Sequence, residues 1–169
     1  LDLDQEFVYV GDEGVVEPSG KTRRVGVDMS LRYQLLPWLF ADADLNFSRP
    51  RARIAPEGEG FIPLSPTVSS IGGLSVETPF GLKGSLRYRH LAARPANEAW
   101  TLTAEGYTLL DANLSFSLND RWTIGTSVNN LLNRKWNEAQ FETESRLQNE
   151  AASVSEIHFT PGSPRFAKA

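Results

Sequence analysis

The clearest pattern in the chain is a strict alternation of apolar and polar positions between residues 24 and 35. One set of alternate positions is apolar, and the positions between them are polar or glycine. The apolar set is Val25, Val27, Met29, Leu31, Tyr33 and Leu35. Successive side chains of a β-strand point to opposite faces, so a period of two residues indicates a strand. Residues 24–35 are therefore predicted to form a strand with one apolar and one polar face.

The same alternation recurs and predicts an all-β fold, an antiparallel meander of about eight strands. We expect these strands within residues 1–10, 24–35, 38–48, 68–76, 82–91, 110–118, 122–128 and 156–169. Residues 11–20 and 92–106 are expected to be connections, and the polar segment 138–155 could hold a helical turn or two. Short reversals at Leu36–Pro37, Pro79–Gly81 and Asn119–Asp120 alternate with long loops after Ser48, Leu91 and Trp136. Short turns at one end and long loops at the other are typical of outer-membrane barrels, so the predicted strands are interpreted as transmembrane, with periplasmic turns and extracellular loops.

Aromatic and charged residues fit the same interpretation. The aromatic residues expected at the membrane interfaces lie near strand ends, and they are Tyr33, Trp38, Phe80, Phe116, Trp122 and Trp136. The polar rows would then face the barrel lumen. The lumen-facing residues predicted in this way are Asp28, Arg32, Asp42, Asp44, Arg87, Asp111 and Asn113.

A water-soluble antiparallel barrel or sandwich has the same alternation, with its apolar face as the core and its polar face in water. In a membrane barrel the apolar face points outward to lipid, whereas in a soluble barrel or sandwich it points inward to the core. Alternation alone leaves both open.

Composition narrows the functional classes. The chain has 169 residues, a net charge of −4 and a pI near 5.2, which argues against nucleic-acid binding, and the short basic run Lys21–Arg24 is expected to flank a turn. Cysteine is absent, which excludes disulfides and thiolate chemistry. No apolar run is long enough for a membrane-spanning helix, and no signal peptide is visible. A chain that begins at Leu1 without methionine is expected to be a piece of something longer.

Candidate catalytic and metal sites are sparse. His90 and His158 are far apart in sequence and have no carboxylate at the spacing of metal ligands, so no metal and no cofactor are expected. Asp42 and Asp44 share one face of a strand, but a hydrated polar row explains them better than acid–base catalysis does. No G-x-S-x-G motif is present, and we expect no enzyme. Ligand-binding residues are left unassigned.

Residues 106–136, GYTLLDANLSFSLNDRWTIGTSVNNLLNRKW, together with 156–166, EIHFTPGSPRF, resemble the C-terminal end of TonB-dependent outer-membrane receptors. The resemblance implies a large barrel, an N-terminal plug domain that occludes it, and a short segment that contacts TonB for energised uptake of ferric siderophores, cobalamin or other scarce ligands. Such receptors usually end in an aromatic residue, whereas this chain ends Phe166-Ala167-Lys168-Ala169. A plugged barrel needs about 22 strands. Residues 1–169 are therefore expected to be a single barrel segment, a C-terminal fragment without the plug domain and the upstream strands.

The expected function is thus that of a receptor for uptake of a ferric siderophore or similar ligand, in the outer membrane of a Gram-negative bacterium. Its expected partners are outer-membrane lipid, TonB through an N-terminal segment absent here, and the ligand, with no nucleic acid. Two alternatives remain: a complete small outer-membrane barrel of structural or adhesive role, and a soluble β-barrel that binds a small apolar ligand. If the chain folds alone, we expect its first and last strands to pair with each other, or its edges to pair between copies.

Overall fold

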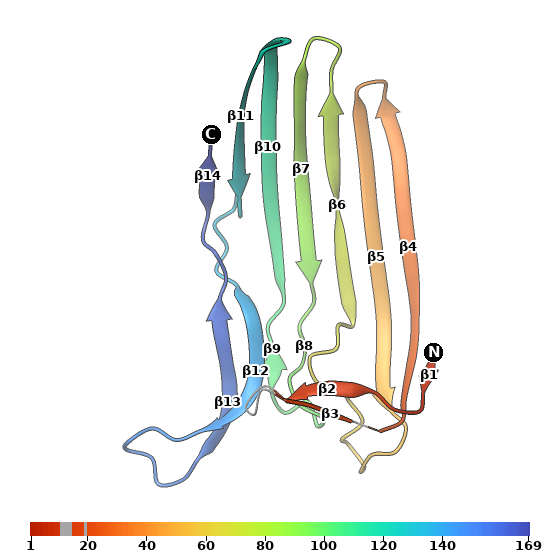
Figure 1. The fold of residues 1–169 in the computed structure, drawn as a ribbon. Helices are drawn as coiled ribbons and strands as arrows, with labels where there is room; N and C mark the ends of the chain where they lie inside the picture. Colours follow the sequence, from red (N-terminus) through yellow and green to blue (C-terminus); the bar gives the residue numbers. More distant parts are fainter. Residues whose placement is uncertain (11–14, 19) are drawn as a thin grey trace.

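The computed structural model describes residues 1–10, 15–18 and 20–169, and it contains one large antiparallel sheet (Figure 1). The sheet has eight strands in the order β1-β4-β5-β6-β7-β10-β11-β14. Their bounds are β1 Asp2–Leu3, β4 Thr22–Leu36, β5 Leu39–Ala52, β6 Val68–Glu77, β7 Leu82–Leu91, β10 Tyr107–Asn119, β11 Trp122–Asn129 and β14 Phe166–Lys168. The all-β meander predicted from alternation is confirmed, with tight turns at Leu36–Leu39, Glu77–Leu82 and Asn119–Trp122.

Three two-stranded hairpins lie at the long-loop end of this sheet (Figure 1). They pair β2 (Phe7–Val10) with β3 (Val15–Pro18), β8 (Arg94–Pro95) with β9 (Thr103–Ala104), and β12 (Asn137–Ser145) with β13 (Val154–Pro161). The long connections between the predicted strands therefore form short β-hairpins.

Several sequence predictions are corrected in these connections. The one strand expected within residues 156–169 is two strands, β13, which pairs with β12, and β14, which pairs with β11, and the connection expected at 92–106 contains the short β8–β9 pair. The helical turns expected within residues 138–155 are wrong, because strand β12 occupies this segment up to Ser145 and pairs in register with β13. Cross-strand pairing satisfies the backbone and overrides a weak local preference. The single strand expected within residues 1–10 is divided into β1, which pairs with β4, and β2, which pairs with β3. Of the connection expected at 11–20, residues 11–14 and 19 lie outside the described part of the chain.

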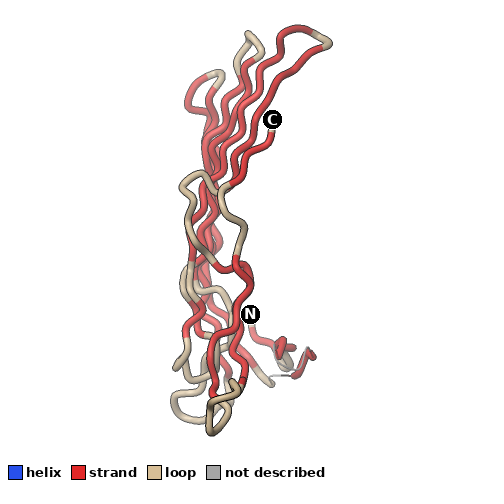
Figure 2. The backbone as a smooth tube through the Cα atoms, turned by 90° about the vertical axis from the view of Figure 1, so that its left-hand side faces the viewer, coloured by secondary structure: helices blue, strands red, loops and turns tan. Residues whose placement is uncertain are grey.

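Among the described residues, the first and last strands of the sheet are not paired with each other. Strands β1 and β14 stand at opposite ends of the strand order, so the expected pairing of the first and last strands is not found. Figure 2 shows the sheet from its side as one tall layer. Within the described residues, β4 has a strand neighbour on its outer edge only at Thr22–Arg23, and β11 only at Ser127–Asn129. Pairing between copies stays a prediction.

One face of the sheet is apolar and uncovered. All six apolar residues of the alternating set on β4 are exposed, and Val25 and Tyr33 each keep 61% of their accessible surface. Among the residues whose burial the structure describes, the buried apolar ones are few, namely Ile62, Ala96, Ala104 and Leu109, with Pro50 and Pro95. A water-soluble domain of this size normally buries its large apolar side chains in a core. Among the described residues, no helix has the length and apolar character needed to cross a membrane.

Candidate functional site

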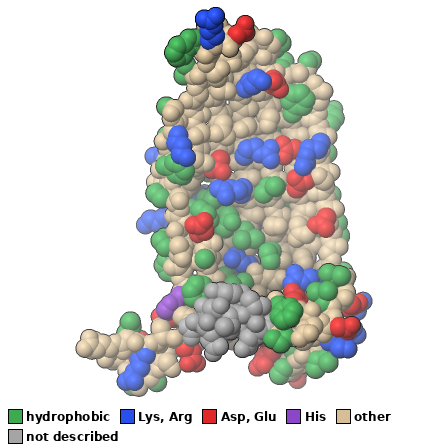
Figure 3. Space-filling view, in the orientation of Figure 1, with side chains coloured by type: hydrophobic (Ala, Val, Ile, Leu, Met, Phe, Trp, Pro, Cys, Tyr) green, Lys and Arg blue, Asp and Glu red, His purple; other side chains and the backbone are tan. Residues whose placement is uncertain are grey.

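The opposite face of the sheet carries charged residues in cross-strand rows. One row joins Arg32 of β4, Asp42 of β5, Gly73 of β6, Arg87 of β7 and Asp111 of β10, each opposite the next in the strand register. Charges of opposite sign thus alternate along the row, apart from the glycine. Figure 3 shows Lys/Arg and Asp/Glu side chains interspersed across this part of the molecule.

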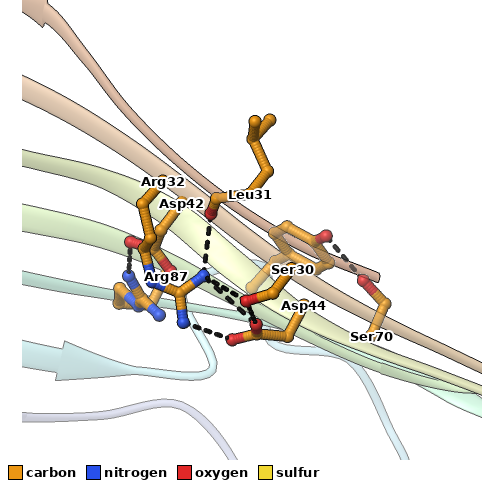
Figure 4. Close-up of polar contacts among 8 residues, drawn as sticks. Ser30, Leu31, Arg32, Asp42, Asp44, Ser70 and Arg87 are labelled. Atoms are coloured by element: carbon orange, nitrogen blue, oxygen red, sulfur yellow. Dashed lines mark hydrogen bonds and ion pairs between the residues drawn. The ribbon is translucent and has the colours of Figure 1, made fainter. Parts of the chain in front are cut away.

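The glycine allows an ion pair to cross a whole strand. Arg87 Nη1 donates to Asp42 Oδ1 over β6 (Figure 4), and the two side chains are mostly shielded from solvent. Gly73 lies between them in the register and has no side chain to separate them. A Cβ at Gly73 would also collide with the carbonyl oxygen of Leu86. We therefore assign Gly73 a specific role in bringing Asp42 and Arg87 together.

A second ion pair joins the neighbouring strands β4 and β5. The guanidinium of Arg32 contacts both carboxylate oxygens of Asp44, with Nη1–Oδ1 and Nη2–Oδ2 distances of 3.1 and 2.8 Å (Figure 4). Ser30 Oγ donates to the same carboxylate at 2.5 Å. This fork geometry fixes both side chains, although solvent-exposed pairs add little stability.

Further ion pairs extend the polar face in both directions. Arg89 Nη2 lies 3.3 Å from Asp111 Oδ2, and Lys83 Nζ lies 2.5 Å from Glu77 Oε1 near the short turns. The carboxylates of this face are thus largely neutralised by arginine and lysine, an arrangement typical of a hydrated wall.

The seven predicted lumen-facing residues all share this polar face. Asp28 accepts a hydrogen bond from Asn46 at 2.5 Å, and Asn113 Nδ2 donates to Ser85 Oγ at 3.3 Å. The predicted lumen-facing set did not include Glu77, Lys83 and Arg89. Lys83 and Arg89 share the polar side of their strand with the predicted Arg87, whereas no residue of the strand that contains Glu77 was in the set. Gly73 gave no signal, because a glycine in a strand does not reveal which side chains it separates.

The six predicted interface aromatics occupy two environments. Five are exposed on the sheet at or near the short turns, namely Tyr33, Trp38, Phe80, Phe116 and Trp122. Trp136 is half-buried at the other end, where its ring packs edge-on against Tyr107 with centroids 4.8 Å apart. Its Nε1 donates to the carbonyl of Ser163 at 3.1 Å.

Asn130, in the sequence NNLLNR that follows β11, is a buried connector. It adopts a left-handed backbone, with φ of 51°, and only 4% of its surface is exposed. Its Nδ2 donates to the carbonyls of Arg134 and Ser163, its Oδ1 accepts from Arg134 N, and its own N–H donates to Asp111 Oδ1. Asn130 therefore ties the end of β11 to β10 and to the segment that leads into β14.

A small packed region at the long-loop end contains several further buried polar groups. Gln140 both donates to Glu105 O and accepts from Glu105 N at 2.8 Å, and Asn97 Nδ2 donates to Glu142 Oε1 at 3.2 Å. Arg94 is also buried, and its Nη1 has no hydrogen-bond partner within the described residues. Burial lowers the pKa of Arg94, which means that the surroundings disfavour its charge.

The two histidines are not brought together. His90 Nδ1 lies 2.8 Å from Thr108 Oγ1, whereas His158 Nε2 lies 3.5 Å from Glu156 Oε1 in the β12–β13 hairpin. Among the residues that the structure describes, no group of three or more His, Asp or Glu side chains could hold a metal ion. Asp42 and Asp44 each contact an arginine instead of each other, so their positions fit the polar row better than an acid–base pair.

Comparison with known proteins gives one family and several similar structures. The family described as "TonB dependent receptor-like, beta-barrel" matches residues 2–131. No curated protein matches the chain in sequence.

Three of the similar structures are named for uptake, import or transport. The ferric yersiniabactin uptake receptor FyuA from Yersinia pestis is 18% identical, with a TM-score of 0.64 over 85% of this chain. The ferric-catecholate import receptor Fiu from E. coli K12 is 17% identical, with a TM-score of 0.67 over 98% of this chain. The copper transporter OprC is also 17% identical, with a TM-score of 0.62 over 96% of this chain. At these identities the likeness concerns the fold. The chain spans 23% of FyuA, 22% of Fiu and 26% of OprC.

Proposed function

Because the chain belongs to the TonB dependent receptor-like β-barrel family, we propose that it is the C-terminal part of the barrel wall of an outer-membrane receptor. The receptor takes up a scarce ligand, such as a ferric siderophore, with energy supplied through TonB. In this proposal residues 1–169 are one barrel segment, and the plug domain, the TonB-contacting segment and further strands belong to the remainder of the gene product.

The observation that carries the proposal is the contrast between the two faces of the sheet. Met29 and Leu31 are exposed on one face, whereas Arg32, Asp42 and Arg87 form ion pairs on the other. In a lipid bilayer the apolar row meets hydrocarbon chains, and the paired charges line a hydrated lumen. In water the same sheet would leave most of its apolar surface uncovered.

The unpaired sheet edges support a place within a larger barrel. An exposed strand edge offers free N–H and C=O groups, and no lipid group can satisfy them in the hydrocarbon region. The outer edges of β4 and β11 are unpaired over most of their described length. Strands from the rest of the gene product would pair with them.

The ligand class comes from the similar structures and is part of the proposal. FyuA is named for ferric yersiniabactin uptake, Fiu for ferric-catecholate import and OprC for copper transport. Ferric siderophore uptake is the form that we propose. Ligand contacts are expected from the long-loop end, where β8, β9, β12 and β13 pack together.

The test uses the whole gene product in its native bacterium. Deletion of the gene should abolish growth on one ferric siderophore as the sole iron source, and deletion of tonB should have the same effect. The protein should fractionate with the outer membrane. Recovery of the protein in the soluble fraction would contradict the membrane placement, and normal uptake of radioactive iron from every siderophore tested would contradict the ligand class.

A further inference from the structure

The arginines of the polar face do not pair with the carboxylates directly opposite them. Arg32 lies directly opposite Asp42 in the strand register, but it pairs with Asp44. Arg87 lies directly opposite Asp111, but it reaches across β6 to Asp42 (Figure 4). Directly opposite side chains of an antiparallel pair have Cβ atoms about 4.5–5.5 Å apart, closer than diagonal neighbours. The two directly opposite pairings are therefore within reach of these arginines and unused.

Arg89 accounts for this choice of partners. Its Nη2 lies 3.3 Å from Asp111 Oδ2, and this is the longest contact of the three ion pairs. With Asp111 occupied in this way, all three arginines of the face have a carboxylate. The directly opposite set pairs only two of them and leaves Arg89 and Asp44 on either side of Ile71. The side chain of Ile71 separates these two charges, whereas Gly73 leaves the way across β6 open.

The three carboxylates differ in how well they tolerate the loss of an arginine. The side chains of Asp42 and Asp111 are each 17% exposed, whereas that of Asp44 is 37% exposed. Asp44 also accepts a hydrogen bond from Ser30 Oγ at 2.5 Å. An unpaired carboxylate costs least where water and hydrogen-bond donors reach it. If Arg89 leaves Asp111, the wall is therefore more stable with Asp44 unpaired than with Asp111 unpaired.

Exchange of partners is easy at this exposure, because solvent-exposed ion pairs contribute little stability. We propose that the three ion pairs form a charge relay along the polar face. When an anionic group in the lumen binds Arg89, each of the other two arginines moves to the carboxylate directly opposite it. The Asp44 carboxylate is then left free to accept a cation.

The charge relay couples two places on the wall. An anion bound on β7 opens a cation-binding carboxylate on β5, two strands away, which is ~10 Å at the ordinary spacing of strands. The partner that fits is a chain segment or ligand in the lumen that carries one negative and one positive group at about this separation. The inference rests on the proposed function in one respect, that the polar face lines the lumen.

The experiment measures how fast individual carboxylates react in the whole gene product, purified in a non-ionic detergent. A carbodiimide and glycine ethyl ester label them, and peptide mass spectrometry gives the rate at each aspartate. R89Q removes the cation from Asp111, as an anion bound to Arg89 would. In R89Q, Asp44 should react roughly threefold or more faster than in the wild type, because it has lost its ion pair, and Asp111 should keep its wild-type rate. A fixed set of pairs predicts the reverse, with faster labelling at Asp111 and none of the change at Asp44.

Three variants are matched controls. D111N breaks the same ion pair from the other side but leaves no carboxylate to be filled, so Asp44 should keep its wild-type rate. R89K retains a cation for Asp111 and should also keep Asp44 near its wild-type rate. K83Q removes one positive charge from the same face of β7, and it should speed labelling only at Glu77, its ion-pair partner. If R89Q does not assemble, R89S makes the same test, because the Arg89 side chain is half-exposed.

Three results would overturn the inference. These are a wild-type rate at Asp44 in the Arg89 variant that assembles, faster labelling at Asp111 in that variant, and equal acceleration at Asp44 in D111N. The last result would mean a general loosening of the wall instead of an exchange of partners. Failure of the proposed function is distinguishable, because fractionation tests the membrane placement independently. A membrane protein whose Asp44 keeps its wild-type rate contradicts only the charge relay.

Discussion

The two ends of the sheet differ in what covers their apolar side chains. At the long-loop end, Ile62, Ala96 and Ala104 are buried by the connections and hairpins packed around them. At the short-turn end, Phe80 and Trp122 each expose 67% of their surface, and no described segment packs on them. The first end is built like a small water-soluble domain. The second depends on its surroundings for the burial that the chain does not supply.

The largest expected effect comes from a charge in the apolar row. M29K should lower the free energy of unfolding by about 2–4 kcal/mol, because in the proposed membrane placement the lysine must leave water at mid-bilayer depth. The measurement is denaturant unfolding of the whole gene product in lipid vesicles.

N113K is the matched control, since it adds the same charge to the polar face of β10. It should cost much less than M29K. If both variants lost stability equally, the assignment of the two faces to lipid and lumen would be wrong.

A comparable loss of stability is expected at the long-loop end, where hydrogen bonds between side chains and backbone stabilise the structure. N130A removes a buried amide that joins Arg134 and Ser163, and it should cost about 2–3 kcal/mol of unfolding free energy. N130G removes the same amide but tolerates the left-handed backbone, so it should cost slightly less than N130A. A loss below about 0.5 kcal/mol in both variants would mean that Asn130 does not hold the last strand.

A smaller effect is expected from the ion pair that crosses β6. A double-mutant cycle with D42N and R87Q should give a coupling energy of about 1 kcal/mol, because the pair is partly shielded from water. The matched cycle, E77Q with K83Q, concerns an exposed pair and should give less than about 0.5 kcal/mol. A larger coupling energy for Glu77–Lys83 than for Asp42–Arg87 would contradict the role assigned to Gly73. G73A should reduce the Asp42–Arg87 coupling.

The smallest effect is expected at Arg94. R94M should leave the unfolding free energy unchanged or raise it by up to about 1 kcal/mol, because a buried guanidinium whose Nη1 has no hydrogen-bond partner among the described residues costs more than an apolar side chain of similar size. The lowering of the Arg94 pKa by burial points the same way, since folding disfavours the charge on this side chain. A loss above 1 kcal/mol would indicate an anionic partner for Arg94 from elsewhere in the gene product.

Much of the sheet was predictable because alternation and turn residues can be recognised within short stretches of sequence. Alternation over residues 24–35 defines both faces of β4, and Thr78–Gly81 carries the proline and glycine of a tight turn. The seven polar residues predicted for one face are found there, because a period of two places every second residue of a strand on the same side. The family could also be recognised, because residues 106–136 carry its pattern of aromatic and asparagine positions.

The remaining features depend on contacts between distant parts of the chain. Strand β12 forms because it pairs with β13, although its own residues do not alternate clearly. Asn130 acquires its role from Ser163, and Asp42 meets Arg87 only because Gly73 lies between them. The amino-acid sequence by itself determined the strands, their two faces and their turns, since these follow from side-chain spacing and backbone preference. Only the tertiary structure decided that the strand order of the described residues stays open and that no described segment covers the apolar face, because these depend on strand register and on what packs against each face.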